Sequence, residues 1–123
     1  MGAFASLDAI APQQLADGYF ARVVHGERIT MAIFEIDPGA ELPEHQHENE
    51  QLGMVITGSV RFRVGAEERA LCPGETWRIT SHTPHSVTPG DAGALVVDVF
   101  SPPRDEWRAV VELDSRPASW PAV

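Results

Sequence analysis

The chain of 123 residues carries a formal net charge of −9, from 18 acidic and 9 basic side chains. Such a charge argues against nucleic acid or an anionic membrane as a partner, because both repel a strongly acidic protein. The length suits one domain with its own core, and 43% hydrophobic with 22% charged residues is the composition of a globular protein, not of a disordered one.

The chain opens with a segment that shows no strong strand or helix pattern. Residues 1–18 have weak hydrophobic periodicity and contain Pro12 and Gly18, so we expect an arm or a short edge element. β-Branched and aromatic residues dominate 19–24 and 29–36, which predicts two strands joined by a turn.

Turn sequences and short apolar runs alternate through the middle of the chain. Asp-Pro-Gly at 37–39 and Cys-Pro-Gly at 72–74 are typical turn sequences, and Gly58 with Ser59 is expected to end a strand. Residues 60–64 alternate apolar and polar side chains, which indicates a half-buried strand. The strands expected in this part are 52–57, 60–64, 69–71 and 76–80.

The last third continues the pattern and ends in a tail. We expect strands at 85–88 and 94–100 with a turn at 89–91 between them, and a helical turn or an edge strand at 105–113. Many short strands separated by turn signals, with no convincing long helix, predict an all-β sandwich or small barrel. The expected organisation is an arm at 1–18, a barrel at 19–113 and a tail at 114–123.

The stretch from Gly39 to Gly58 carries the clearest chemical signal. His45, His47 and Gln51 share one face of an extended chain, because successive side chains point to opposite faces. Imidazoles on one face with an oxygen donor nearby suit a divalent first-row metal. The stretch is therefore predicted to supply metal ligands.

Such a site needs a fourth donor, and His85, which follows Pro84, is the expected one. Glu48 and Glu50 are rival ligands, but their even numbering points them away from the two histidines of an extended chain. His82 lies in a loop and is expected to be exposed. The alternative to a metal site is a surface loop that happens to contain two histidines.

Two stretches of the sequence resemble the motifs of the cupin superfamily. The spacing of the first motif is matched by Gly39, His45, His47, Gln51 and Gly58. Gln51 stands where the family usually has glutamate. Residues 74–85 resemble the second motif, from its opening glycine to its closing histidine. The departures are Thr80 and His82 in place of proline and glycine, and Pro89 in place of asparagine. The resemblance covers residues 19–103 and implies a double-stranded β-helix barrel with a metal held on its inner face.

Within this superfamily the chain resembles the pectin-degradation cupins, the KdgF-like proteins. The resemblance rests on Glu50 with Gln51 and on the run Asp-Val-Phe-Ser-Pro-Pro-Arg at 98–104. It implies one divalent transition metal per chain (Ni, Zn, Mn, Fe or Co), held by His45, His47, Gln51 and His85. It also implies a site lined by Asp98, Phe100 and Arg104. The implied activity is ring opening of 4,5-unsaturated monouronates to the linear keto form, after polyuronate lyases have acted.

The chemistry of the ligands favours a non-redox role. Three imidazoles and an amide are neutral and leave a divalent metal its full charge, which suits an anionic or polyoxygenated ligand. Oxygen-activating iron sites commonly combine two histidines with a carboxylate instead. Because the chain has no lysine, an anionic substrate would have to be held by arginine, a backbone nest or the metal.

The three residues expected to line the site each have an alternative role. Asp98 lies in the apolar run 95–100, and a buried carboxyl near a metal is a natural general acid or base; otherwise it faces solvent or pairs with an arginine. Phe100 shares its face and is a pocket wall or a core residue. Arg104 is a partner for a substrate carboxylate or a surface residue.

Two other functions fit the same barrel. One is a metal-dependent dioxygenase or polyketide-type cyclase, and the other is a cupin that binds a small molecule without turnover. In each case the partner is a small molecule, expected here to be an anionic sugar acid. The single Cys72 excludes an internal disulfide and fits a reducing cytoplasm. The sequence contains no run of about 18 apolar residues, so we expect no membrane span. We expect a cytoplasmic homodimer.

Overall fold

The protein is described here by a computed structural model, which covers residues 2–121. Its strands are β1 Gln13–Ala16, β2 Tyr19–His25, β3 Thr30–Ile36, β4 Leu42–His45, β5 Glu50–Val64, β6 Glu67–Leu71, β7 Thr76–Ile79 and β8 His85–Ser101. Two 3-10 helices, η1 Leu7–Ala9 and η2 Asp105–Ala109, complete the elements. No helix within the described range is long and apolar enough to cross a membrane.

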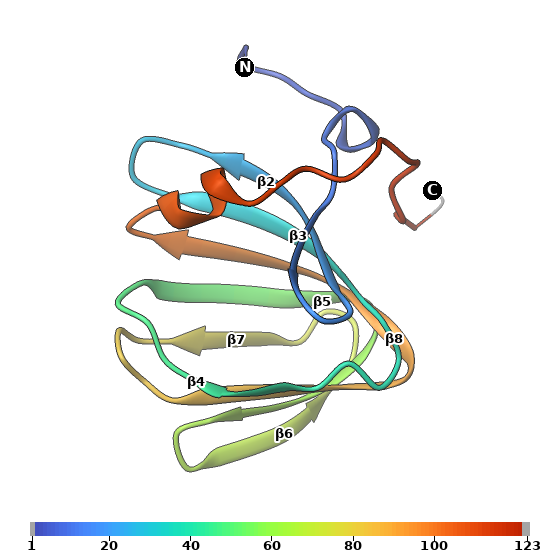
Figure 1. Ribbon diagram of the computed structural model, residues 1–123. Helices are drawn as coiled ribbons and strands as arrows, with labels where there is room; N and C mark the ends of the chain where they lie inside the picture. Colours follow the sequence, from blue (N-terminus) through green and yellow to red (C-terminus); the bar gives the residue numbers. More distant parts are fainter. Residues whose placement is uncertain (1, 122–123) are drawn as a thin grey trace.

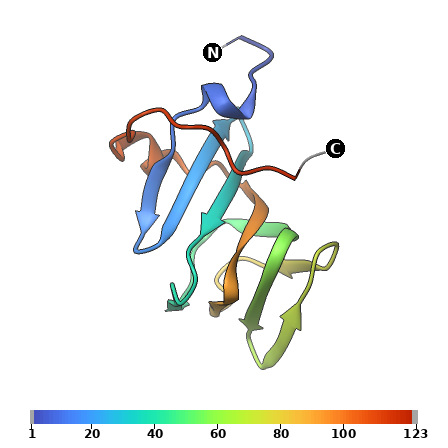
Figure 2. The same ribbon diagram turned by 90° about the vertical axis from the view of Figure 1, so that its right-hand side faces the viewer.

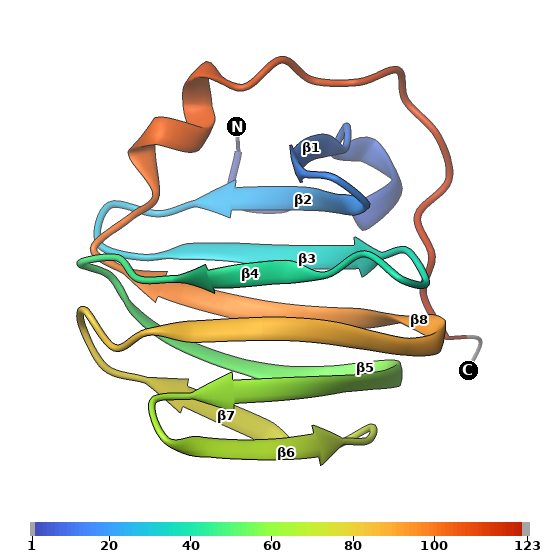
Figure 3. The same cartoon turned by 60° about the horizontal axis from the view of Figure 1, so that its bottom comes forward.

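The strands form two facing layers, and the two longest strands belong to both (Figures 1 and 3). The second half of β8 pairs with β3 and with the first half of β5, which also pairs with β7. The first half of β8 pairs with β4 and with the second half of β5, which also pairs with β6. All these pairings are antiparallel, so the predicted all-β barrel is confirmed.

The strand end predicted at 58–59 and the turn predicted at 89–91 are wrong, because both segments lie inside the long strands. The pairing of β5 with β8 shifts in register there: Gly58 faces Ala94, whereas Val60 faces Pro89. Gly58 has a φ of +75°, a left-handed conformation that a residue with a side chain adopts only at a cost. These turn-forming residues therefore bend the strands from one layer to the other without ending them.

Side chains from both layers fill the space between them. Inward-pointing residues alternate with outward ones along β2 and β3, as the period of a strand requires. The buried apolar members of this core include Tyr19, Ala21, Val23, Ala32, Phe34, Ile36, Val55, Val60, Phe62, Val87 and Val96. A cavity remains between the layers, and several core side chains, such as Phe34, Val60 and Val96, also line it.

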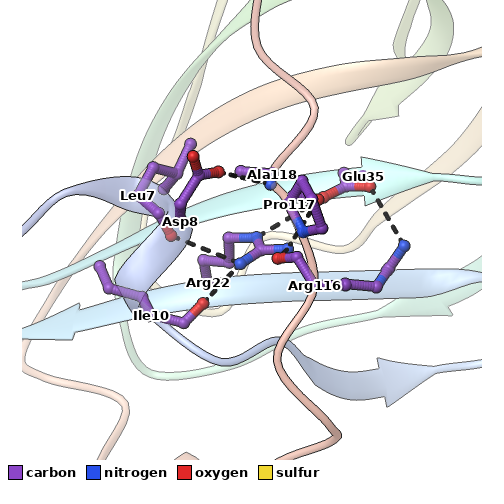
Figure 4. Close-up of polar contacts among 8 residues, drawn as sticks. All are labelled: Leu7, Asp8, Ile10, Arg22, Glu35, Arg116, Pro117 and Ala118. Atoms are coloured by element: carbon purple, nitrogen blue, oxygen red, sulfur yellow. Dashed lines mark hydrogen bonds and ion pairs between the residues drawn. The ribbon is translucent and has the colours of Figure 1, made fainter.

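The N-terminal segment and the C-terminal tail meet on the outside of β2 (Figure 2). Arg22 on β2 is 1% exposed and holds both (Figure 4). Its Nη1 donates to the carbonyl of Ile10 at 2.6 Å and its Nη2 to that of Arg116 at 2.9 Å. Its Nε lies 3.6 Å from the Glu35 carboxylate. One buried guanidinium thus joins the two terminal segments to the sheet.

Candidate metal centre

The structure brings the three predicted histidines together. His45 ends β4 and pairs with His85, the first residue of β8, while His47 lies in the link to β5. The ring centroids are 4.2 Å apart for His45 and His85, 4.9 Å for His47 and His85, and 5.9 Å for His45 and His47. One ring nitrogen from each lies within 4.8 Å of the other two, a spacing that could hold a metal ion.

Backbone carbonyls determine which ring nitrogen of each histidine is free. Every Nδ1 lies at hydrogen-bond distance from a carbonyl oxygen: His45 to Pro43 at 2.9 Å, His47 to Asn49 at 2.9 Å and His85 to Thr83 at 2.8 Å. A carbonyl only accepts, so each Nδ1 carries the proton and each Nε2 keeps its electron pair. The Nε2 of His85 is buried and has no partner within residues 2–121.

Gln51, near the start of β5, offers the fourth donor atom. Its Nε2 donates to Asp98 Oδ1 at 2.9 Å, which turns its Oε1 toward His47 Nε2 at 3.1 Å. Both facing atoms are then electron-pair donors, and such a contact is unfavourable unless a cation or a proton lies beside them. Burial lowers the pKa of His47, which disfavours the proton. The donor set therefore fits a divalent cation held by three imidazoles and one amide oxygen.

Burial keeps the His85 imidazole in the form that a metal requires. Burial is the main reason that the pKa of His85 falls to about 4; the neighbouring His45, His47 and Arg104 contribute, and the hydrogen bond to the Thr83 carbonyl opposes the decrease. A histidine with such a pKa is neutral at physiological pH, so its Nε2 is available as a ligand without first losing a proton.

Asp98 is a buried carboxyl in the wall of the cavity, on the inner face of β8. Its Oδ1 accepts two hydrogen bonds, from Gln51 Nε2 at 2.9 Å and from Trp77 Nε1 at 2.7 Å. Burial raises the pKa of this carboxyl to about 6, although the two hydrogen bonds and the charge of Arg104 oppose the increase. It can therefore exchange a proton near neutral pH.

Arg104 and Phe100 line the same cavity. The guanidinium of Arg104 lies 4.3 Å from the Trp107 ring and 5.0 Å from the Phe100 ring, and its Nε donates to Glu106 at 2.9 Å. Phe100 is buried, with its ring centroid 5.9 Å from that of His47. An arginine and a buried carboxyl thus share one cavity with the histidine cluster.

The cavity has a volume of about 190 Å³. Its polar lining is confined to His45, His47, Gln51, His85, Asp98 and Arg104 together with the polar atoms of Tyr19, Trp77 and Trp107, and the rest is aliphatic or phenyl. A small molecule with several oxygens would find its polar partners gathered in one part of this space.

The remaining histidines and the rival carboxylates do not join the cluster. Glu48, Glu50 and His82 are exposed. His25 lies at the end of β2 and its Nδ1 contacts Thr30 Oγ1 at 2.9 Å, outside the residues that line the cavity.

The sequence did not reveal the contact between Trp77 and Asp98. The signal that could have found it is Gly53, since a glycine inside a strand often marks the close approach of another group. Asn49, whose carbonyl orients His47 and whose side chain donates to the carbonyl of Pro102, was also missed.

Comparison with known proteins agrees with the fold. Residues 32–100 match the family described as Cupin domain. The pectin degradation protein KdgF of Dickeya dadantii (strain 3937) is 25% identical over 97 residues, which cover 77% of this chain and 88% of that protein. The structure of KdgF from Halomonas sp. superposes with a TM-score of 0.79 at 30% identity, covering 85% of this chain and 98% of that one. An RmlC-like cupin from Shewanella frigidimarina NCIMB 400 shares the fold, with a TM-score of 0.81 at 20% identity over 87% of this chain and 96% of that one.

Proposed function

This chain belongs to the cupin domain family, and from that premise we propose that it opens the ring of 4,5-unsaturated monouronates to give the linear keto form in a metal-dependent reaction. The observation that carries the proposal is that Gln51, one of four neutral donors, is hydrogen-bonded to the buried carboxyl of Asp98, whose pKa is raised. Its support from other proteins is the similarity to two KdgF proteins, one of them named for pectin degradation.

In this proposal the Nε2 atoms of His45, His47 and His85 and the Oε1 atom of Gln51 hold one divalent metal. When bound, the metal supplies Lewis-acid polarisation of substrate oxygens. The choice among Ni, Zn, Mn, Fe and Co stays open, because an all-neutral set of nitrogen and oxygen donors suits each of them.

Arg104 is proposed to bind the substrate carboxylate. A guanidinium presents several N–H donors in one plane and can pair with a carboxylate through two of them. The Nε of Arg104 is paired with Glu106, whereas the guanidinium face rests on Trp107 and lines the cavity. Phe100, beside the arginine, is proposed to be the apolar wall that keeps the substrate ring in place.

Asp98 is proposed to move the proton. Ring opening removes the proton of the anomeric hydroxyl, breaks the bond between the anomeric carbon and the ring oxygen and leaves an enol. Since the hydroxyl proton has been removed, this enol is formed as its enolate; returning that one proton at C4 gives the ketone, so the reaction is an isomerisation with no atom gained or lost. Oδ1 of Asp98 is occupied by two donors, so Oδ2 is the oxygen that would accept the proton and return it.

The test is an assay of metal-reconstituted protein with 4,5-unsaturated galacturonate freshly released by a lyase. Loss of the ring double bond, followed by ultraviolet absorbance or NMR, is expected to be faster than the spontaneous reaction. His85→Ala is expected to remove the acceleration and the bound metal together. His82→Asn is the matched control, because it removes an exposed histidine while allowing the positive φ of that position.

No acceleration by metal-loaded protein would contradict the proposal. Oxygen consumption with iron bound would then favour the dioxygenase, and saturable binding without product would favour the binding protein. The homodimer and the cytoplasmic location expected from the sequence stay predictions, which sedimentation equilibrium and cell fractionation would test.

A further inference from the structure

Three residues on neighbouring strands form one inward-facing row beside the histidines. Gly53 on β5 pairs with Asp98 on β8 on one side and with Trp77 on β7 on the other. Any side chain at position 53 would overlap with Asp98 Oδ1 and with the indole nitrogen of Trp77. Gly53 does not have a positive φ, so the glycine provides space and not a special backbone conformation.

This space lets the indole reach across β5. Trp77 Nε1 donates to Asp98 Oδ1 at 2.7 Å, and Gln51 Nε2 donates to the same oxygen at 2.9 Å. The Trp77 ring is also packed against Phe62, with centroids 4.8 Å apart. A carboxylate oxygen that accepts two buried donors has little freedom to rotate, so Asp98 is held in one orientation.

The orientation of Asp98 decides which end of the Gln51 amide faces the histidines. An ionised carboxylate only accepts hydrogen bonds, so it selects the NH₂ group of the amide and leaves Oε1 beside His47. In the reversed orientation the amide would turn its NH₂ group toward the histidines, and the site would lose its oxygen ligand.

We propose that Trp77 is a positioning residue of this site: its indole N–H fixes Asp98, which in turn holds Gln51 with its oxygen toward the three histidines. The inference rests on the metal binding in the proposed function and is independent of which substrate is converted. It assigns Gly53 a role as well, since the Trp77 hydrogen bond needs a residue without a side chain between the two groups.

The first test is Trp77→Phe, which removes the N–H donor and keeps an aromatic ring. Loss of a group that orients a ligand typically lowers metal affinity by 10–100-fold, so the dissociation constant for Mn²⁺, measured by calorimetry, is expected to rise at least about tenfold. The visible absorption of the Co²⁺-loaded protein is expected to change, because a misoriented amide changes the donor set. Trp107→Phe makes the same chemical change in the same cavity, but no hydrogen bond joins that indole to Asp98 or Gln51 in residues 2–121, so both readouts should stay as in the parent.

Gly53→Ala is the second variant, because it keeps every donor and adds one methyl group between Trp77 and Asp98. It is expected to weaken Mn²⁺ binding in the same direction. If both variants bind Mn²⁺ with the parent affinity and show the parent Co²⁺ spectrum, the proposal is overturned.

NMR of the metal-free protein separates this inference from the proposed function. The hydrogen bond from Gln51 to Asp98 should slow the exchange of the Gln51 side-chain amide protons with water. Trp77→Phe should accelerate that exchange several-fold, whereas Trp107→Phe should leave it unchanged. Faster exchange supports the positioning role even if no uronate is converted, and unchanged exchange in a folded Trp77→Phe variant contradicts it.

Discussion

Gln51 differs from the glutamate that cupins commonly have at this position in two ways. It leaves the donor set neutral, so a bound divalent cation keeps its charge of +2 for an anionic ligand. It also donates to Asp98, which a glutamate could do only if it kept its own proton. The amide therefore allows a buried carboxyl to lie next to the proposed metal ligands.

Gln51→Glu is expected to weaken binding of an anionic ligand by about tenfold, because the added negative charge lowers the net positive charge of the metal site and lies beside Asp98. Calorimetry of galacturonate binding to Mn²⁺-loaded protein measures this. Gln46→Glu adds the same charge on an exposed residue of the same loop and should have little effect. Equal affinity of the parent and Gln51→Glu would contradict the argument.

Asp98→Asn is expected to reduce turnover by at least about 100-fold, because the amide cannot exchange a proton at neutral pH. The Asn oxygen can still accept from Gln51 and Trp77, so elemental analysis should find the parent amount of metal. Full activity would disprove the proton-transfer role, and loss of metal together with activity would show that the carboxylate is needed to hold the site.

The histidines were predictable because their spacing in one extended segment, and the later Pro-His, carries the information. Asp98 was predictable as a charge inside an apolar run. The partner of Asp98 was not, because Trp77 reaches it only through the pairing of β7 with β5 and the space at Gly53. Such a contact depends on three strands that are separate in sequence.

Between elements, Arg22 is the main polar connection outside the site. Its guanidinium accounts for hydrogen bonds to carbonyls of the N-terminal segment and of the tail, and it neutralises Glu35 on β3. Removing a buried charge that has partners leaves those partners without hydrogen bonds, and the cost is larger than that of a surface ion pair.

Arg22→Met is expected to lower the free energy of unfolding by about 3 kcal/mol in urea titrations. Hydrogen exchange should accelerate in residues 7–10 and 116–118, which contact this arginine or lie beside it. Arg61→Met is the control: Arg61 is 58% exposed and its ion pair with Glu68 spans 3.4 Å, so the loss should stay below about 1 kcal/mol. Equal losses in the two variants would contradict the role of Arg22.

The division into arm, barrel and tail stays a prediction, which limited proteolysis of the parent would test.

Strands were predictable where β-branched residues alternate, as in β2 and β3, and not where the chain bends. β5 and β8 were each divided in two by the prediction, because glycine and proline at their corners have the composition of a turn. Whether such residues end a strand or bend it depends on the partner strand, and local sequence does not contain that information. β4 was missed because Leu42–His45 is short, has no alternating pattern of apolar and polar residues and contains Pro43.

At the scale of the whole molecule, the spacing of the two motifs predicted the barrel fold, and the barrel brings the histidines of both motifs together. The first motif supplies β4, the following link and the first part of β5, and the second supplies β7 and the start of β8. A metal held by these segments would join strands at one end of the barrel in addition to the backbone pairing and side-chain contacts that already connect them. Metal binding should therefore stabilise the folded chain as well as complete the site.

Addition of Mn²⁺ at about 100 times its dissociation constant is expected to raise the free energy of unfolding by about 2.7 kcal/mol, because the ion binds only the folded chain. Urea titration with and without Mn²⁺ measures the difference, and a chelator should reverse it. His82→Asn should keep the stabilisation, since that side chain is exposed and outside the cluster. His85→Ala should lose it, since the Nε2 of His85 is the buried atom without a partner in residues 2–121. Equal stabilisation in these two variants would mean that Mn²⁺ binds elsewhere, and the assignment of the metal ligands would then be wrong.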